Sequence, residues 1–374
     1  MFKRLFLWIG FFDWYLAGNI FFLTLFGLAS LYSLQISVAN PNFTFFNRQL
    51  VFCLIGWAVF LLVSRIDYKF WGSYYKVILL VTFLVLIAVL FSGFKIRGTM
   101  GWFNFFGQTF QPVEFAKVAL IIFLAKFFSS RGPKIGFLKD VFGSGIIVAF
   151  MVGLVMLQPD LGSAMILFVT WLGIILLVPV RKKTILIILA VLAIAISLFL
   201  LLFLKDYQRD RILTFISPQR DPLGAGYNVR QSVVAIGAGG IAGRGLSFGS
   251  QSQLNFLPEQ ETDFIFAVIA EELGFVGAGL VLLLFLALMI RLWRISRQTT
   301  DNFASLVCSG MIFYFLSQIF INVGMNLGIA PVAGIPLPFI SAGGSSLLGV
   351  FLAMGIVHNI QIKNRTSFFN KEKW

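Results

Sequence analysis

Long apolar runs follow one another along almost the whole chain, and short polar segments separate them. An apolar run of roughly 20 residues is long enough to cross the hydrocarbon core of a bilayer as a helix. The pattern therefore predicts an all-α, polytopic integral membrane protein with ten transmembrane helices. The predicted spans are 15–37, 50–64, 77–93, 112–128, 140–157, 161–179, 184–204, 263–290, 303–327 and 341–362.

We interpret residues 1–374 as one membrane domain. Its basic and aromatic start, 1–14, predicts a helix that lies at the membrane interface and leads into the first span. A long loop, 205–262, separates the seventh span from the eighth, and a tail, 363–374, follows the last span.

The chain is 59% hydrophobic and 12% charged, which excludes a soluble globular protein. Its net charge of +14 does not indicate nucleic-acid binding, because most basic residues fall in short loops between spans. If the N-terminus is cytoplasmic, 19 of the 29 Lys and Arg residues lie on the inner side, and the short outer loops hold only Arg48, Lys95 and Arg97. We therefore expect both termini in the cytoplasm. The segments then expected on the outer face are 94–111, 158–160, 205–262 and 328–340.

Five of the fifteen acidic residues crowd the stretch LNFLPEQETDFIFAVIAEELGF, 254–275. Carboxylates in or beside hydrocarbon are costly and are candidates for function. Asp263 could be a cap or a first-turn charge of the eighth span, but the acids around it favour a role in an outer cavity. Glu271 and Glu272 lie deeper and face different sides of the helix, so we expect them to tie it to its neighbours.

Three more ionisable residues lie at the outer ends of predicted spans: Glu114, Lys117 and Asp160. Glu114 and Lys117 are three residues apart and share a helix face, so they could form an ion pair. That pair could be purely structural, or it could form one network with Asp160. The one histidine, His358, lies near the cytoplasmic end of the last span. A general base on the outer face must therefore be a carboxylate or a lysine.

Two outer segments are rich in glycine. IGAGGIAGRG, 236–245, holds a weak dinucleotide-binding pattern, but its glycines better suit a re-entrant or tightly folded loop. Its backbone amides and Arg244 could face phosphates. NLGIAPVAGIPLPFISAGGSS, 326–346, breaks helical regularity, which is tolerated at this depth only beside a cavity or within protein. These features suit a polar, phosphate-bearing headgroup whose tail stays in lipid.

No organic cofactor is expected, and no cluster of His and Cys ligands is present in the sequence. A divalent cation, Mg or Mn, could be held by Glu114, Asp160 or Asp263 together with phosphate oxygens of a substrate.

Five runs form a specific set: QPVEFAK (111–117), QPDLGSA (158–164), DPLGAGYNVRQSVVAIGAGG (221–240), FLPEQETDFIFAVIAEELG (256–274) and GIPLPFISAGGSS (334–346). Together they resemble the SEDS family (shape, elongation, division, sporulation) of bacterial peptidoglycan glycosyltransferases. The resemblance covers essentially the whole chain, and GYNVRQS and LNFLPE are most similar to its elongation branch, RodA. The chain departs from the family pattern at Gly101, where the family usually has Arg, and at Ala342, where the family has an aromatic residue. Arg97 could take the place of the Arg that is missing at Gly101.

The resemblance implies polymerisation of lipid II during cell elongation and rod-shape maintenance, in the bacterial cytoplasmic membrane with the active site facing outward. It implies an inverting transfer in which Asp263 is the general base and undecaprenyl pyrophosphate leaves. The substrate-binding or supporting candidates are Glu114, Lys117, Asp160, Trp102, Arg209, Ser341, Ser345 and Ser346.

The resemblance also implies a partner, a class B penicillin-binding protein that acts as transpeptidase. A division (FtsW-like) or sporulation role, a flippase or transporter, and a scaffold for the partner stay open as alternatives. Ten spans with intramembrane charges fit a transporter too. However, the sequence shows no clear internal repeat, and the charges cluster toward the outer face.

Overall fold

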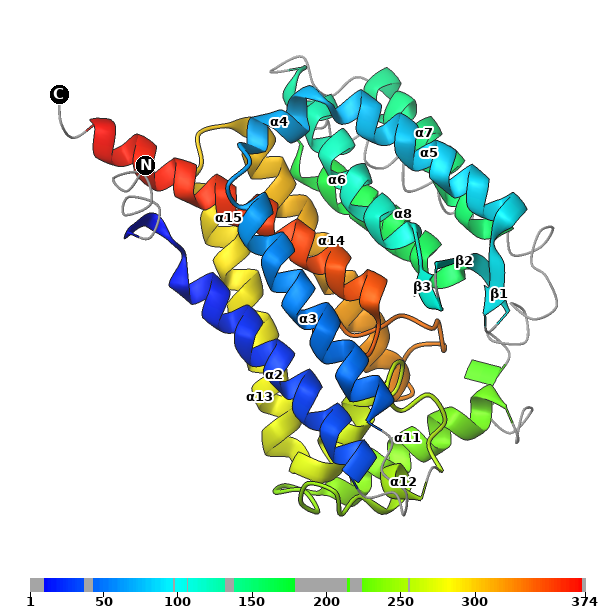
Figure 1. Cartoon of the computed structure of the whole chain (residues 1–374). Coiled ribbons are helices and arrows are strands. Elements are labelled where there is room, and N and C mark those ends of the chain that lie inside the picture. Colours follow the sequence, from blue (N-terminus) through cyan, green and yellow to red (C-terminus); the bar gives the residue numbers. More distant parts are fainter. Residues whose placement is uncertain are drawn as a thin grey trace.

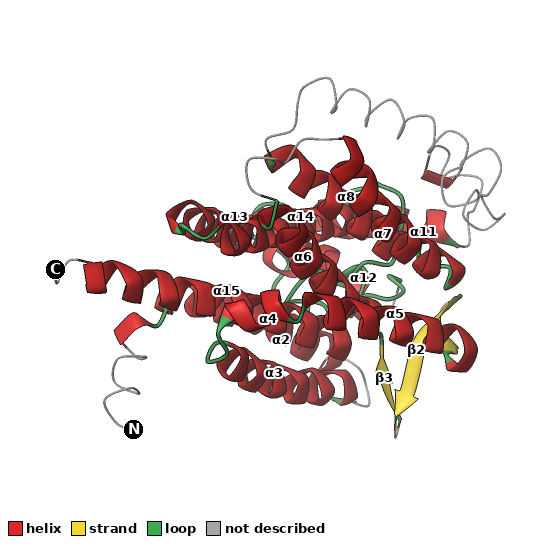
Figure 2. Cartoon of the chain, turned by 90° about the horizontal axis from the view of Figure 1, so that it is seen from above, coloured by secondary structure: helices red, strands yellow, loops and turns green. Residues whose placement is uncertain are grey.

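The structure is a bundle of long helices with a small sheet at one edge (Figures 1 and 2). The computed structural model describes residues 10–36, 43–96, 98–105, 107–131, 138–178, 214–215, 224–254 and 256–371. Nine described helices coincide with predicted spans: α2 (Trp14–Ile36), α3 (Thr44–Val63), α5 (Tyr75–Ser92), α6 (Val113–Ser129), α7 (Leu138–Leu157), α8 (Leu161–Leu177), α13 (Ile265–Gln298), α14 (Asn302–Asn326) and α15 (Gly344–Lys371). The seventh predicted span, 184–204, and residues 1–9 of the predicted interfacial helix lie outside the described residues.

Seven of the described helices are long and apolar enough to cross a membrane, and α8 is a shorter apolar helix. The chain is therefore a multi-pass membrane protein. Close helix packing depends on small residues, as it does in other membrane bundles. At Gly56 on α3, an added Cβ would collide with the ring of Phe351 on α15, so only glycine allows these two helices to approach so closely.

The segment 94–111, predicted as an outer loop, instead forms a three-stranded antiparallel sheet of β1 (Phe94–Ile96), β2 (Thr99–Phe105) and β3 (Gln108–Phe110). Its turns pass through Gly98 and Gly107, whose φ values of 87° and 79° favour glycine. The sheet lies beside the end of α5 (Figure 2). It brings the aromatic residues of this segment to the end of the bundle.

The segment 205–262, predicted as a long loop, is partly helical where the structure describes it. It contains α11 (Ala225–Gly239) and the single-turn α12 (Ser250–Gln253). α11 packs against α13, at the same end of the bundle as the sheet (Figure 1).

α13 is not one continuous helix, in contrast to the predicted span. Gly274 has a non-helical backbone with φ 66° and ψ −164°. The N–H groups of Phe275 and Val276, which lose their helical acceptors there, donate to the carbonyl oxygens of Gly240 and Ile241 at 2.9 and 3.1 Å. The loop after α11 therefore repairs the break in α13.

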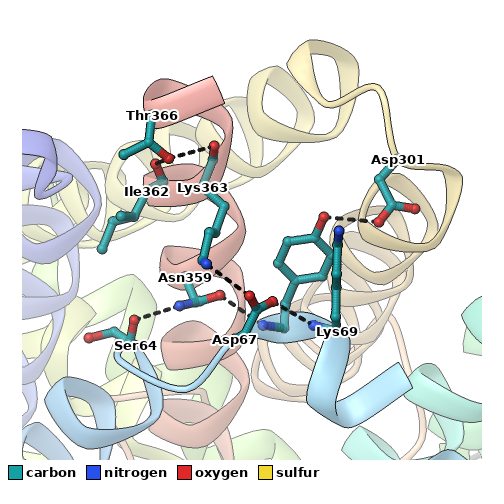
Figure 3. A network of polar contacts seen from close by, with 9 residues as sticks. Ser64, Asp67, Lys69, Asp301, Asn359, Ile362, Lys363 and Thr366 are labelled. Atoms are coloured by element: carbon teal, nitrogen blue, oxygen red, sulfur yellow. Dashed lines mark hydrogen bonds and ion pairs between the residues drawn. The ribbon is translucent and has the colours of Figure 1, made fainter. Parts of the chain in front are cut away.

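The two ends of the bundle differ. We call the end that holds the starts of α3, α6, α8, α13 and α15 the cavity end, and the opposite end the closed end. At the closed end α4 (Tyr68–Ser73) follows α3. There, Asn359 of α15 donates to the carbonyl oxygen of Ser64 and accepts from the N–H of Tyr68, both at 2.8 Å (Figure 3). Asp67 pairs with Lys363 at 2.8 Å. Side chains thus bind α3, α4 and α15 to one another.

Candidate active site

A cavity of about 270 Å³ lies at the cavity end, between the start of α3, the sheet and the segments that precede α8, α13 and α15. Asp160 and Asp263 are the acidic side chains of its described lining, and Arg48 is the one cation of that lining. The predicted site residues that line this same cavity are Asp263, Asp160, Trp102, Ser345 and Ser346.

Asp263 is fixed through its backbone. Its carbonyl oxygen accepts hydrogen bonds from the side-chain amides of Asn322 and Asn326, each at 3.0 Å. Both asparagines are fully buried on α14, four residues apart, so they share one helix face. Asn322 also donates to the carbonyl oxygen of Ile335 at 2.8 Å, in the segment before α15. This clamp holds the backbone of Asp263 in place beside the cavity.

The first turn of α13 is capped from another helix. The helix begins at Ile265, and its N-cap residue, Phe264, makes no side-chain cap hydrogen bond. Instead, Oδ1 of Asn326 accepts from the backbone N–H of Ala267 at 3.1 Å. Asp263 lies in the turn before the helix, and not in its first turn as the predicted span 263–290 implied. Asn326 therefore caps the first turn of α13 through its side-chain oxygen.

The turn 259–263 presents Asp263. Glu259 has a positive φ of 56°, and its carbonyl oxygen accepts from three successive backbone N–H groups, 262–264. The hydroxyl of Ser341 donates to the carbonyl oxygen of Thr262 at 2.5 Å. Ser341 is 4% exposed and lies outside the cavity lining. It therefore anchors the turn that carries Asp263, in keeping with a supporting role.

Asp160 caps α8 and joins a hydrogen-bonded wall of the cavity. Its Oδ1 accepts from the backbone N–H of Ser163 at 2.9 Å, which satisfies one of the open amides of the helix N-terminus. Its Oδ2 accepts from Nε2 of Gln111 at 3.2 Å. The N–H of Gln111 in turn donates to Oγ of Ser345 at 2.9 Å. Gln111 thus links Asp160 to the start of α15.

Glu114 and Lys117 form the expected ion pair, with Nζ of Lys117 at 2.7 Å from Oε1 of Glu114. Each is 1% exposed, and neither lines the cavity. Their connection to Asp160 is indirect: the carbonyl oxygen of Gln111 accepts from the N–H of Glu114 at 3.3 Å. The pair is therefore packed beneath the cavity wall.

Arg48 is a lining residue that the sequence reasoning missed. Its Nη2 donates to Oγ1 of Thr109 at 3.3 Å, and its guanidinium lies 5.9 Å from the ring centroid of Phe52. One feature of the sequence could have identified Arg48: the short outer loops hold few basic residues, and Arg48 is one of them. A cation kept on that side next to an apolar span is a candidate for an anionic ligand.

Glu271 and Glu272 are buried ties, as predicted. Glu271 accepts from the backbone N–H groups of 251–252 at 2.8 and 3.0 Å, at the start of α12. Glu272 accepts from the hydroxyl of Ser33 on α2 at 2.7 Å and from Nε2 of Gln253 at 3.2 Å. These contacts join α13 to α2 and α12.

The glycine-rich segment 236–245 is not a phosphate cradle. The backbone N–H groups of 244–245 donate to the carbonyl oxygens of 271–272, each at 3.0 Å. The guanidinium of Arg244 donates to Oγ of Ser250 at 2.8 Å. The backbone amides of 244–245, which could have faced phosphates, therefore bond instead to the carbonyl oxygens that the break in α13 leaves open.

Trp102 on β2 pairs in register with Phe94 of β1 and lines the cavity. Its neighbour Gly101 is buried, and an added Cβ would stand 3.0 Å from Oε1 of Gln158. Gln158 therefore occupies the space beside the position where Arg was expected. Arg97 and Arg209 lie outside the described residues.

The candidate ligands for a divalent cation fit only in part. No group of three or more His, Cys, Asp or Glu side chains is arranged to hold a metal ion in the part of the chain that the structure describes. Glu114 is engaged by Lys117, whereas Asp160 and Asp263 share the cavity. Two carboxylates suit a Mg²⁺ that takes its remaining ligands from substrate phosphates and water. An all-protein cage is not formed by the described residues.

A family model for FtsW, RodA and SpoVE, described as a cell cycle protein, matches residues 13–366. The chain is 36% identical over 330 residues to the stage V sporulation protein E of Bacillus subtilis (strain 168), covering 87% of this chain and 89% of that protein. It is 36% identical over 329 residues to the peptidoglycan glycosyltransferase MrdB of Escherichia coli (strain K12), covering 87% of each. A solved structure described as "Structural coordination of polymerization and crosslinking by a peptidoglycan synthase complex" matches with a TM-score of 0.81 and 30% identity, covering 94% of this chain and 97% of that one.

Proposed function

The chain belongs to the FtsW, RodA and SpoVE family of cell cycle proteins, and from this premise we propose that it is a peptidoglycan glycosyltransferase that polymerises lipid II. The observation that carries the proposal is the cavity at the end of the membrane bundle, which Asp263, Asp160 and Arg48 line together. Such a cavity suits a substrate whose sugars and pyrophosphate lie at the membrane surface while its polyprenyl tail stays in lipid.

Asp263 acts as the general base. It takes the proton from the 4-hydroxyl of the acceptor sugar as that oxygen attacks the anomeric carbon of the donor. One direct displacement inverts the α-linked donor to a β-linked product, and undecaprenyl pyrophosphate leaves. The clamp of Asn322 and Asn326 on its carbonyl supports this role, because a base must be held within hydrogen-bond reach of the proton it removes.

The leaving pyrophosphate needs positive charge. Arg48 supplies it from the described lining, and its bond to Thr109 orients the guanidinium. A divalent cation held by Asp160, Asp263 and phosphate oxygens would add to that charge when bound. Trp102, Ser345 and Ser346 line the same space and contact the substrate sugars.

Within the family we assign the chain to cell elongation, because GYNVRQS (226–232) and LNFLPE (254–259) resemble that branch. Identity alone does not separate the roles, since the sporulation relative and MrdB match at the same 36%. The partner is a class B penicillin-binding protein. The site faces the extracytoplasmic side of the bacterial cytoplasmic membrane, as the distribution of basic residues favours.

The test is polymerisation of labelled lipid II by the purified chain, alone and with its partner, in wild type and Asp263→Asn. General-base help is typically worth ~10²–10⁴ in rate, and the Asp263→Asn variant should lose about that factor while its unfolding temperature stays unchanged. Asp301→Asn, at the closed end, is the matched control and should polymerise normally. An Asp263→Asn variant as active as wild type contradicts the base assignment. Lipid II movement without a glycan product would indicate a flippase instead.

A further inference from the structure

A buried amide on α3 holds the backbone that leads into α15. Gln49 follows Arg48 in the sequence, is 4% exposed and lines the same cavity. Its Nε2 donates to the carbonyl oxygen of Ser341 at 3.0 Å, and its Oε1 accepts from the N–H of Gly343 at 3.1 Å. The amide thus uses one donor and one acceptor on the same short stretch of backbone. That stretch cannot slide along α3 without breaking one of the two bonds.

The other side of the same segment, 341–343, bonds to the turn before α13. The N–H of Ala342, which lies between the two residues that the amide holds, donates to the carbonyl oxygen of Glu261 at 2.8 Å. The hydroxyl of Ser341 donates to the carbonyl oxygen of Thr262 at 2.5 Å. The segment is therefore fixed between α3 on one side and this turn on the other.

Glycines allow the loop before α15 to lie close to its neighbours. An added Cβ at Gly344, the first residue of α15, would stand 2.5 Å from the ring of Phe52 on α3. An added Cβ at Gly27 on α2 would stand 2.5 Å from the carbonyl oxygen of Ile340. The loop therefore has little space to move independently of these two helices.

We propose that Gln49 is a positioning residue that sets the separation of Arg48 and Asp263 across the cavity, and this inference rests on the proposed function. Arg48 is its neighbour on α3, whereas Asp263 belongs to the turn that 341–343 holds. The cation must reach the leaving pyrophosphate while the carboxylate reaches the attacking hydroxyl. A misplacement of about 1 Å, caused far from the chemistry, can cost about a hundredfold in rate. Gln49 thus serves the reaction by aligning two other side chains.

Two other sets of bonds preserve the turn when the amide is lost. The carbonyl oxygen of Glu259 still accepts from the N–H groups of 262–264, and the two asparagines of α14 still hold the carbonyl of Asp263. These bonds lie within the turn or lead to α14, and they do not involve α3. Loss of the amide should therefore leave the turn folded but less firmly placed relative to Arg48.

The first experiment measures polymerisation of labelled lipid II by Gln49→Met, which keeps the length of the side chain but removes its donor and acceptor. Its kcat should fall about 10–100-fold while its KM changes less than about threefold, because alignment of the reacting groups is lost rather than substrate binding. Asn19→Leu is the matched control, since this buried amide also bonds a carbonyl oxygen, that of Leu284, at 3.0 Å, but joins α2 to α13. The control should polymerise at the wild-type rate. A wild-type kcat for Gln49→Met, or an equal loss in the control, overturns the inference.

The second experiment measures the coupling without the reaction, by hydrogen exchange of the purified full-length chain. The segments followed are 341–343 and 259–264, the second being one step beyond the residues that Gln49 bonds. In Gln49→Met, exchange should accelerate about tenfold in both segments, and in Asn19→Leu in neither, because a lost hydrogen bond lowers local protection by about that factor. Faster exchange confined to 341–343 overturns the inference. If the wild type makes no polymer, the proposed function fails, and exchange at 259–264 alone decides whether Gln49 positions the turn.

Discussion

At the closed end, side chains join α3, α4 and α15 to one another and α4 to the start of α14, whereas at the cavity end the starts of α3 and α15 line a polar space. Asn359 bridges Ser64 and Tyr68, and the hydroxyl of Tyr68 donates to Asp301 before α14 at 2.9 Å (Figure 3). At the other end, Arg48 of α3 and the start of α15 line the cavity. One end uses its polar groups to close the bundle, and the other leaves them facing a cavity.

The difference lies in which atoms hold the polar residues in place. Closed-end residues are held by their own side chains, so a substitution removes the contact. The backbone of Asp263 is held through its carbonyl oxygen by Asn322 and Asn326, and these two bonds do not depend on the identity of its side chain. Substitutions at the closed end should therefore affect stability alone, whereas substitutions at the cavity end should also affect activity. Four sets of substitutions test that contrast.

The largest stability effect should come from Lys117→Met. Lys117 lies beneath the cavity wall, so this substitution tests whether burial rather than position in the bundle sets the stability cost. Removing one partner of a buried ion pair leaves an uncompensated charge and typically costs about 3–5 kcal/mol. The closed-end control is Lys363→Met, whose ion pair with Asp67 is 48% and 43% exposed. An exposed pair is worth about 0.2–1 kcal/mol. Denaturant unfolding of both variants checks this, and equal costs would contradict the burial argument.

Replacing one asparagine by leucine at each end should have comparable effects on stability but should lower activity at the cavity end only. Asn359→Leu leaves the carbonyl of Ser64 and the N–H of Tyr68 open, at about 1–3 kcal/mol for each buried group. Asn322→Leu opens two carbonyl oxygens, including that of Asp263. Only Asn322→Leu should lower polymerisation per folded molecule. A normal rate for that variant would show that the clamp does not position Asp263.

Two helix caps provide a smaller matched pair. Asp160 caps α8 through the N–H of Ser163, and Asp301 caps α14 through that of Phe303, each at 2.9 Å. Replacing either by Ala should cost about 0.5–2 kcal/mol of stability. Asp160→Ala should also slow polymerisation, because Asp160 lines the cavity. Unfolding and rate assays of both variants separate capping from catalysis, and equal rates would remove Asp160 from the site.

The smallest effect concerns Asp67. Burial alone would raise its pKa, but hydrogen bonds from Lys363 and from the N–H of Lys69, with both charges, lower the pKa on balance. A lowered folded-state pKa stabilises the protein above the unfolded value, and that stability is lost as pH falls through the folded value. Asp67→Asn should thus cost less than about 1 kcal/mol at neutral pH and nothing in acid. Unfolding temperatures that differ more in acid than at neutral pH would refute the sign.

Hydropathy predicts the long helices because lipid demands apolar runs of a fixed length, and nine predicted spans match described helices. Hydropathy does not predict the break in α13 at Gly274, because the apolar run continues across this residue. The break is visible only from the hydrogen bonds that the loop after α11 makes there. The sheet at 94–110 escapes the same method because its turns depend on glycine backbone, not on apolar length.

The sequence predicts the acidic residues of the candidate site, but it misses Arg48 and the neutral asparagines that hold Asp263. Asp263, Asp160 and the Glu114–Lys117 pair are charges at span ends, which the membrane makes conspicuous. Asn322 and Asn326 are neutral, and their role becomes visible only when α14 is packed against the turn before α13. Ser341 was predicted to bind the substrate or to support the site, and its contact with the turn before α13 could not be read from the sequence.

The carboxylates of α13 also carry information about the order of assembly. Ser33 on α2 and the segment 247–253 supply the described hydrogen bonds to Glu271 and Glu272, and all of them precede α13 in the chain. Because synthesis runs from the N-terminus, each partner has been made before the helix that needs it. The hydrogen-bond partners of both buried acids are therefore already synthesised when α13 enters the membrane.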